Sequence, residues 1–387
     1  MKNSRKALAM LLALMMVLAL AACGSQKDPT PTPDPSTPDD SNKTFTADDI
    51  SDVMNSADGK YEIAMVTDLA QLKDKSFNQG TWDGVKTYAY ENGKSYKYYQ
   101  PANGSEATDS DRYDAFIAAI NNGAKIIVAP GYAQYNALYQ AATEHPEVSF
   151  VFIDGWDTGL DNVAGIFYHE EQSGFMAGYA CVKDGMTKLG YSGGGGGGNP
   201  AINRSGYGFV QGANAAAAEM GVQVEVKFSF LYGDSYSASD ALQTQINGWY
   251  ASGTEVVMAY GGKMCDSIFA AAAANNAYSI GGDVDQSGDS KTVITSALKG
   301  LGASVQLALS SYYDGNWDSV KGGTQLGIKE DAAGLPMAAS RFETFSEADY
   351  EALVDAMKSD ELVVSADFEK FFAGEETFSN VTVTFIK

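Results

Sequence analysis

The sequence predicts an α/β protein of two lobes, each a doubly wound parallel sheet covered by helices. From residue 61 onward, short apolar runs alternate with amphipathic segments of helical periodicity. Such alternation is typical of parallel sheets with helices on both faces. It falls into two series of roughly a hundred residues each, with no long low-complexity break between them, which favours two lobes over one large sheet.

The first 22 residues have the pattern of a bacterial signal peptide. A basic stretch precedes an unbroken apolar run over residues 7–22, which is shorter than the about 20 residues that a membrane-spanning helix needs. Small residues stand directly before Cys23, as in a lipobox. We therefore expect a lipid on Cys23 that anchors the protein to the extracytoplasmic face of the cell membrane; the alternative is ordinary secretory cleavage that leaves a free thiol. Residues 23–57 are expected to be an extended tether, because five prolines fall before residue 39.

The first lobe is expected to cover residues 58–168 and 286–317. Its first strand spans 61–67, and Ser76 with Gln79 predicts a capping box that opens the next helix. The alternation continues with helix 111–121, strand 125–129, helix 133–144 and strand 148–153, and a later strand spans 292–296.

The second lobe is expected to cover residues 169–285 and 318–387. Its elements are helix 170–183, strand 189–192, helix 204–220, strand 222–230, helix 239–251, strand 255–259, helix 265–275 and strand 278–281. Cys181 and Cys265 lie in apolar helical patterns, so we expect buried free thiols, with a single disulfide as the alternative. The six glycines at 193–198 lack the Lys-Ser/Thr of a phosphate-binding loop and predict a turn with positive φ.

Composition excludes several classes of function. The chain has 26 basic and 49 acidic side chains, a net charge of −23, and a nucleic-acid-binding protein needs a basic face instead. Two histidines without a matching cluster predict no metal site, and no cofactor is expected. Asp283 and Asp285 are a close acidic pair that a glycoside hydrolase could use, but residues two apart at a strand end point in different directions. We therefore expect a protein that is not an enzyme.

The candidate ligand-binding residues stand where predicted strands end. In parallel α/β sheets, ligands bind outside the carboxyl ends of the strands. Asp68 and Asp154 follow strands of the first lobe. Strand 255–259 of the second lobe is followed by Tyr260, Gly261 and Gly262, and another strand is followed by Asp283. Lys299 comes shortly after strand 292–296. Carboxylates and an ammonium group at one edge can hold a polar small molecule.

Six short motifs then carry a resemblance to a known family. They are residues 67–68, 74–79 (DKSFNQ), 152–154, 170–174, 282–286 (GDVDQ) and 295–299 (TSALK). In this order they resemble the basic membrane protein family, the substrate-binding lipoproteins of ABC importers that include purine nucleoside receptors. The resemblance implies a type I periplasmic-binding-protein fold with a three-segment hinge, a nucleoside ligand and an ABC permease as partner.

The resemblance also implies roles for single residues. Asp74 would bond the base and Trp82 would stack on it, while Asp154, Asp283 and Lys299 would take the sugar hydroxyls. The full expected set is Asp68, Asp74, Phe77, Asn78, Trp82, Asp154, Tyr260, Gly261, Asp283 and Lys299. Each also has a structural alternative: the aromatics as core, the aspartates as caps or turn formers, and the lysine as a solvated charge.

One segment departs from the family pattern. Residues 69–73 read LAQLK where the family has a glycine-rich loop, and Lys73 stands where a short polar residue would contact the base. A sugar-binding protein and a sensory receptor of the same fold therefore remain alternatives.

Overall fold

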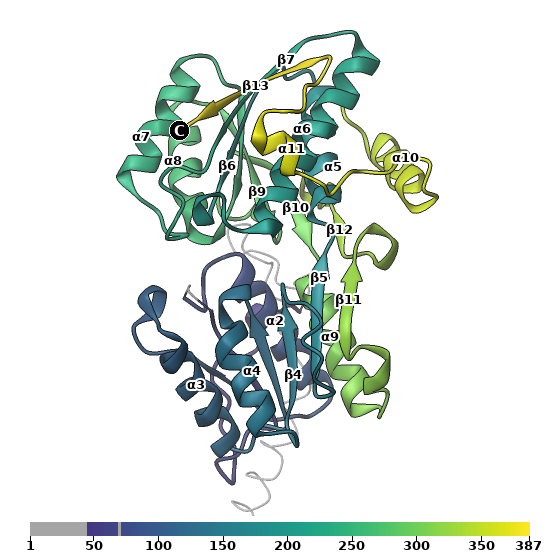
Figure 1. Cartoon of the computed structure of the whole chain (residues 1–387). Coiled ribbons are helices and arrows are strands. Elements are labelled where there is room, and N and C mark those ends of the chain that lie inside the picture. The colour runs from purple at the N-terminus through teal and green to yellow at the C-terminus, as the bar shows by residue number, and fades with distance from the viewer. Residues whose placement is uncertain (1–44, 69–70) are drawn as a thin grey trace, which may run out of the picture. The chain divides into compact units, whose positions relative to one another are not determined.

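The computed structural model describes residues 45–68 and 71–387. The signal peptide, Cys23 and the tether up to residue 44 lie outside the described residues. Within the described part of the chain, no helix is both long and apolar enough to pass through a membrane. Residues 46–387 form one unit that contains two sheets (Figure 1).

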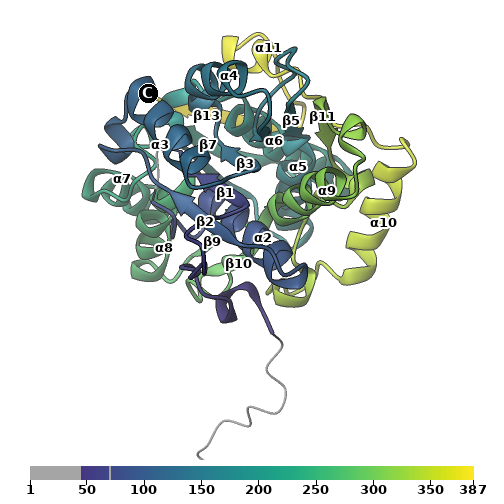
Figure 2. The ribbon, with the colours of Figure 1, turned by 90° about the horizontal axis from the view of Figure 1, so that it is seen from below.

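The first sheet consists of six of the described strands, all parallel, in the order β11-β5-β4-β3-β1-β2. They are β1 (Ile63–Val66), β2 (Tyr96–Tyr99), β3 (Ile126–Pro130), β4 (Ser149–Ile153), β5 (Val163–Tyr168) and β11 (Gly322–Leu326), and the helices of this lobe are α2 (Phe77–Glu91), α3 (Asp109–Asn121), α4 (Tyr135–Glu144) and α9 (Leu301–Tyr313). Ile63 and Met65 pack into the core with α2 and α9, which lie side by side (Figure 2), whereas Ala64 and Val66 pack into the core with α3 and α4. Alternate residues of β1 thus pack against helices on opposite faces of the sheet, as in a doubly wound fold.

The second sheet consists of seven of the described strands in the order β12-β10-β9-β8-β6-β7-β13, parallel except where β10 meets β12. They are β6 (Lys188–Gly193), β7 (Val224–Ser229), β8 (Val256–Tyr260), β9 (Tyr278–Asp283), β10 (Val293–Lys299), β12 (Ala333–Gly334) and β13 (Val381–Ile386). The helices are α5 (Glu170–Lys183), α6 (Pro200–Met220), α7 (Asp240–Ala251), α8 (Cys265–Ala274), α10 (Glu347–Lys358) and α11 (Glu369–Ala373). Met258 packs with α5 and α6, and its neighbour Val257 packs with α7 and α8.

The described chain passes between the two sheets three times. It does so from β5 to α5 at His169, from β10 to α9 at Gly300, and from β11 to β12 over residues 327–332. The three-segment hinge is therefore confirmed, but two expected lobe boundaries are wrong. β10 pairs with β9 and so belongs to the second lobe, and β11 pairs with β5 and so belongs to the first.

The expected end of the tether is also wrong. Residues 46–54, which we call the N-terminal strap, pack on the first lobe rather than extending from it. Ile50 is buried in the core beside α2, and Met54 packs against the same core. The hydroxyl of Tyr96 donates a hydrogen bond of 2.6 Å to the carbonyl of Ser51. Burial of the two apolar side chains of Ile50 and Met54 stabilises the packing of the strap on the first lobe.

Two smaller expectations are confirmed. Cys181 and Cys265 are buried and free. The six-glycine segment is a turn in which Gly195, Gly196 and Gly197 all have positive φ. This turn leads directly into α6.

Candidate functional site

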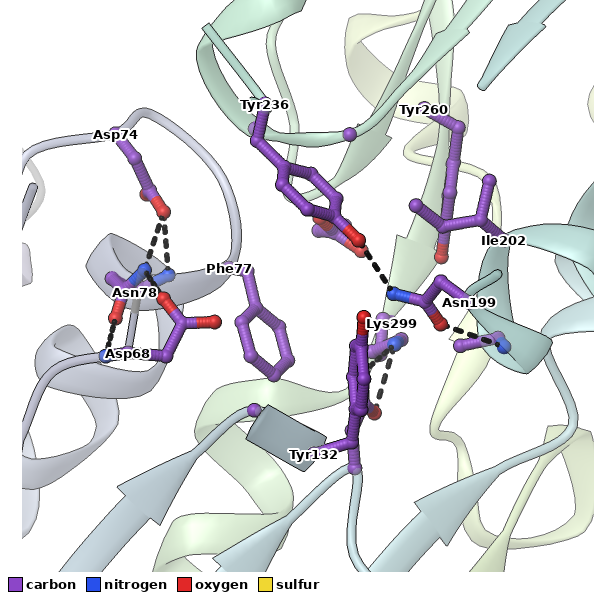
Figure 3. A pocket seen from close by; sticks show the side chains of 16 residues that line it. Asp68, Asp74, Phe77, Asn78, Tyr132, Asn199, Ile202, Tyr236, Tyr260 and Lys299 are labelled. Carbon is purple, nitrogen blue, oxygen red and sulfur yellow. Dashed lines mark hydrogen bonds and ion pairs between the residues drawn. The ribbon is translucent and has the colours of Figure 1, made fainter. Parts of the chain in front are cut away.

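A cavity lies between the carboxyl ends of the two sheets, the place where parallel α/β sheets bind ligands. Its walls come from both lobes (Figure 3). The first lobe supplies Asp68, Asp74, Phe77, Asn78, Gly131, Tyr132 and Asp154; the second supplies Asn199, Ala201, Ile202, Tyr236, Tyr260, Gly261, Gly262, Asp283 and Lys299. A ligand in this cavity would contact both lobes at once.

Nine of the ten residues expected to bind ligand line this cavity. Strand ends explain much of this result. Asp154 comes directly after β4, while Tyr260, Asp283 and Lys299 are the last residues of β8, β9 and β10. Asp154 and Asp283 both have positive φ, 57° and 67°, a conformation that aspartate tolerates better than most side chains.

Trp82 is the exception, and its expected stacking role is wrong. Its side chain is fully buried in the core of the first lobe. The ring packs against Tyr96 and Tyr98, with centroids 5.7 and 5.4 Å away, and Nε1 donates to Asp52 at 2.9 Å. Helical periodicity placed Trp82 on an apolar face, and that face is turned to the sheet rather than the cavity.

Asp74 organises the start of α2. Its two carboxylate oxygens accept hydrogen bonds from the backbone amides of Ser76, Asn78 and Gln79 at 2.9–3.0 Å, and from the Asn78 side chain at 2.9 Å. Asn78 Nδ2 also donates to Asp68 at 2.8 Å. Burial raises the pKa of Asp74 to about 6, although these hydrogen bonds act to lower it.

The capping box expected from Ser76 and Gln79 is therefore wrong. The helix amides that it would satisfy are taken by Asp74, and the side chain of Ser76 makes no capping hydrogen bond. Instead, the Ser76 hydroxyl donates across the cleft to the carboxylate of Asp283. Asp283 thereby links the second lobe to the start of α2.

A chain of mostly buried charges begins at the cavity wall and continues into the second lobe. Lys299 Nζ lies 2.9 Å from both carboxylate oxygens of Asp154 and 3.2 Å from Glu170, and Glu170 pairs with Arg204 at 2.7 Å. Burial raises the pKa of Asp154 to about 6 against the opposing effect of Lys299. Burial alone would lower the pKa of Lys299, but Asp154, Glu170 and Asp283 raise it overall, so the ammonium group stays charged.

Aromatic side chains supply the apolar surface of the cavity. Figure 3 shows Phe77, Tyr132 and Tyr236 around one space. Lys299 Nζ lies 5.2 Å from the Phe77 ring centroid, within cation–π range. Asn199 Nδ2 donates to the Tyr236 hydroxyl at 3.1 Å. A side chain at Gly195 would meet that hydroxyl at 2.3 Å, so the glycine turn makes room for Tyr236.

The sequence reasoning missed six lining residues: Gly131, Tyr132, Asn199, Ala201, Ile202 and Tyr236. Tyr132 and Gly131 follow β3 directly, so the strand-end rule could have found them. Asn199 to Ile202 open α6, and Tyr236 lies in the long connection after β7, where no local signal indicates a cavity.

The site suits a ligand with a flat ring and several hydroxyl or amino groups. Carboxylates accept hydrogen bonds from such groups, the ammonium donates, and aromatic faces stack on rings. Among the described residues, no cluster of three or more histidine, cysteine or acidic side chains could hold a metal ion.

A family model and curated relatives match most of the chain. The model of a family described as PnrA-like ABC transporter substrate-binding proteins matches residues 61–365. The ABC transporter nucleoside-binding protein BmpA of Lactococcus lactis subsp. cremoris is 27% identical over 312 residues, covering 73% of this chain and 85% of that protein. Basic membrane protein B of Borreliella burgdorferi is 28% identical over 302 residues, covering 74% and 83%.

Solved structures show the same fold. A solute-binding protein of an ABC transporter system from Aeropyrum pernix K1 has a TM-score of 0.63 at 20% identity, covering 83% of this chain and 93% of its own. A second such protein, from Conexibacter woesei, has a TM-score of 0.63 at 21% identity, covering 80% and 100%.

Proposed function

Because the chain belongs to the PnrA-like family of ABC transporter substrate-binding proteins, we propose that it captures a nucleoside between its two lobes and delivers it to an ABC permease. The observation that carries this proposal is the composition of one cavity. Aromatic rings, four carboxylates and a buried lysine meet there from both lobes. A nucleoside needs both kinds of surface, because its base is flat and its ribose carries hydroxyl groups.

The proposed pose divides the cavity between base and sugar. Phe77, Tyr132 and Tyr236 would pack on the base, and Asp68 with Asn78 would bond its polar edge. Asp283 and the Asp154–Lys299 pair would hold the ribose, since a carboxylate accepts from two neighbouring hydroxyls while the ammonium donates. Asp74 was expected to bond the base. We propose instead that it caps α2 and so positions Phe77 and Asn78.

A thermal-shift screen of the purified protein tests the ligand. Adenosine, guanosine, inosine, cytidine and uridine are compared with free ribose and with amino acids, each at about 1 mM. A ligand in hundredfold excess over its Kd stabilises the folded state by about 2.7 kcal/mol, which corresponds to a rise in Tm of about 5 °C or more. A shift with ribose and with no nucleoside would favour the sugar-binding alternative, and release of free base from a nucleoside would contradict a pure binding role.

We further propose that Cys23 carries the lipid that holds the protein at the extracytoplasmic face of the membrane. The short apolar run and the small residues before Cys23 support this. Cys23→Ala should release the protein from the membrane fraction with its nucleoside affinity unchanged. A processed variant that stays with the membrane fraction would refute the lipid anchor and leave the ligand proposal intact.

A further inference from the structure

One carboxylate of the N-terminal strap, that of Asp52, contacts both α2 and the residues before it. Its Oδ1 accepts a hydrogen bond from Trp82 Nε1 at 2.9 Å and lies 2.9 Å from Lys86 Nζ. Its Oδ2 lies 3.1 Å from Lys73 Nζ. Trp82 and Lys86 both belong to α2, whereas Lys73 belongs to the segment before that helix, residues 71–76. Asp52 therefore joins three parts of the chain: the strap, the helix and the segment that precedes it.

Lys86 strengthens the attachment of the strap to α2. Its side chain has no exposure to solvent, and Nζ donates to the carbonyl of Ala47 at 2.8 Å and pairs with Asp83 at 3.1 Å. Burial acts to raise the pKa of Asp52, but hydrogen bonds from Lys86, Lys73 and Trp82 lower it overall. A buried ammonium group needs such a partner, because an unpaired charge in the interior is costly.

The position of Lys73 connects this cluster to the cavity. The next residue is Asp74, whose carboxylate holds the amides of Ser76, Asn78 and Gln79. By the family resemblance, Lys73 stands where a short polar residue would contact the base. It is absent from the cavity wall, and its ammonium group is directed to Asp52 instead. The lysine that distinguishes this segment from the family pattern thus has its partner in the strap.

We propose that Asp52 is a positioning residue of the ligand site, which fixes the segment before α2 through Lys73 and the helix itself through Trp82 and Lys86. The backbone of Phe77 and Asn78 is then already ordered before a ligand binds. Binding therefore does not lose the free energy needed to order these residues. This inference rests on the proposed function, but the order of the segment is measurable without any ligand.

Hydrogen exchange on the ligand-free full chain tests the order of the segment. The variants are Asp52→Asn and Lys73→Met, and the readout is the exchange rate of the amides of Ser76, Asn78 and Gln79. The Lys73–Asp52 pair is part-exposed, so Lys73→Met should speed their exchange by about twofold to fivefold, and Asp52→Asn should do so by about tenfold. The matched control is Lys125→Met, which removes an exposed pair with Glu62 of 2.6 Å in the same lobe and should change none of these rates.

Calorimetry with inosine on the same variants tests the consequence for binding. Both variants should weaken inosine binding, Asp52→Asn more than Lys73→Met because Asp52 also holds Trp82 and Lys86. The double variant should bind no worse than Asp52→Asn alone, because the contact that Lys73 makes is already lost there. A lowered Tm in Asp52→Asn with unchanged exchange and unchanged Kd would show a merely structural role and overturn the proposal. If the wild type binds no nucleoside, the proposed function fails, and the exchange rates alone decide the positioning role: unchanged rates in Lys73→Met refute it.

Discussion

Asp283 combines two tasks in one side chain. It lines the cavity and accepts a hydrogen bond from Ser76 of the other lobe. Asp285, two residues later, is exposed and accepts a local hydrogen bond from the amide of Ser287 at 2.9 Å. The pair offers a target and a matched control for the same substitution.

We predict that Asp283→Ala removes the preference for ribonucleosides over 2′,3′-dideoxynucleosides. Charge-assisted hydrogen bonds contribute about 1.5–3 kcal/mol each, so the ribonucleoside should bind about tenfold to a hundredfold more weakly. The dideoxynucleoside lacks the two hydroxyl groups, so it should lose only the affinity that depends on the hydrogen bond between Ser76 and Asp283. Calorimetry with both ligand types gives the two ratios. Asp285→Ala should leave both affinities unchanged; wild-type affinity of Asp283→Ala for guanosine would disprove the assignment.

Asp74 gives the stability of the ligand-free protein a predictable pH dependence. Its pKa in the folded state is raised to about 6 from 3.8, so the folded state binds the proton more tightly than the unfolded state. The stability that this protonation contributes is present below about pH 4 and is lost as the pH rises through about 6.

Denaturant unfolding of wild type and Asp74→Asn at about pH 4.5 and pH 7 isolates this contribution. The difference in free energy of unfolding between the two proteins should change by about 2 kcal/mol, with the wild type relatively more stable at the lower pH. An unchanged difference would mean that the carboxyl titrates normally in the folded protein.

The candidate site was predictable where strand ends decide it. Asp154, Asp283 and Lys299 could be chosen because parallel strands end at a common edge. Trp82 could not be placed, because a helical repeat identifies an apolar face without saying whether it meets the sheet or a cavity. Tyr236 could not be predicted for another reason: its hydroxyl fits at the cavity because Gly195, far away in the sequence, leaves room for it.

Among the elements, helices α5 and α6 make an unusually close pair. A side chain added at Gly178 would meet the backbone carbonyl of Phe209 at 2.0 Å, whereas one at Gly248, inside α7, would have nothing within 4 Å. Because α5 begins with Glu170 and α6 carries Arg204, this packing also fixes the ion pair behind the cavity.

Alanine at these two glycines should therefore have opposite effects on stability. Gly178→Ala forces the helices apart and should destabilise the protein by about 1–3 kcal/mol or more. Gly248→Ala should stabilise it by about 0.5–1 kcal/mol, because alanine has the better helix propensity. Urea unfolding of both variants measures the two values, and equal effects would contradict the close packing of α5 on α6.

At the element level, the alternation of strands and helices could be read from the sequence, but the assignment of strands to lobes could not. The apolar run of β10 would suit either sheet, and only its pairing with β9 places it. The strap was taken for tether because prolines dominate the residues before it, while the few apolar side chains that bury it, Ile50 and Met54, form no repeat.

At the scale of the whole molecule, several contacts at the cleft join the two lobes. Lys75 of the first lobe lies 3.3 Å from Asp289 and 3.6 Å from Asp266 of the second lobe. Gln286 Nε2 donates to the Lys75 carbonyl at 2.8 Å. The two ion pairs are partly exposed, so salt should weaken them.

Lys75→Met should weaken nucleoside binding by about twofold to fivefold, because it removes both ion pairs between the lobes. It should also reduce the loss of affinity between about 50 mM and about 500 mM NaCl, because the variant no longer has these ion pairs for salt to screen. Lys183→Met is the control, since Lys183 pairs at 3.2 Å with Glu219 within one lobe. The same salt dependence in wild type and Lys75→Met would exclude a contribution of this lysine to closure.

The three passages between the sheets also decide when each lobe can be completed during synthesis. A nascent chain that ends at Lys299 already contains β1 to β5 and β6 to β10, yet it lacks α9, which covers the same face of the first sheet as α2, and β11, which forms that sheet's edge. The second sheet also lacks β12 and β13 (Val381–Ile386) at that point. Neither lobe can therefore finish folding at that stage, and a chain without β13 would leave an open strand edge on β7.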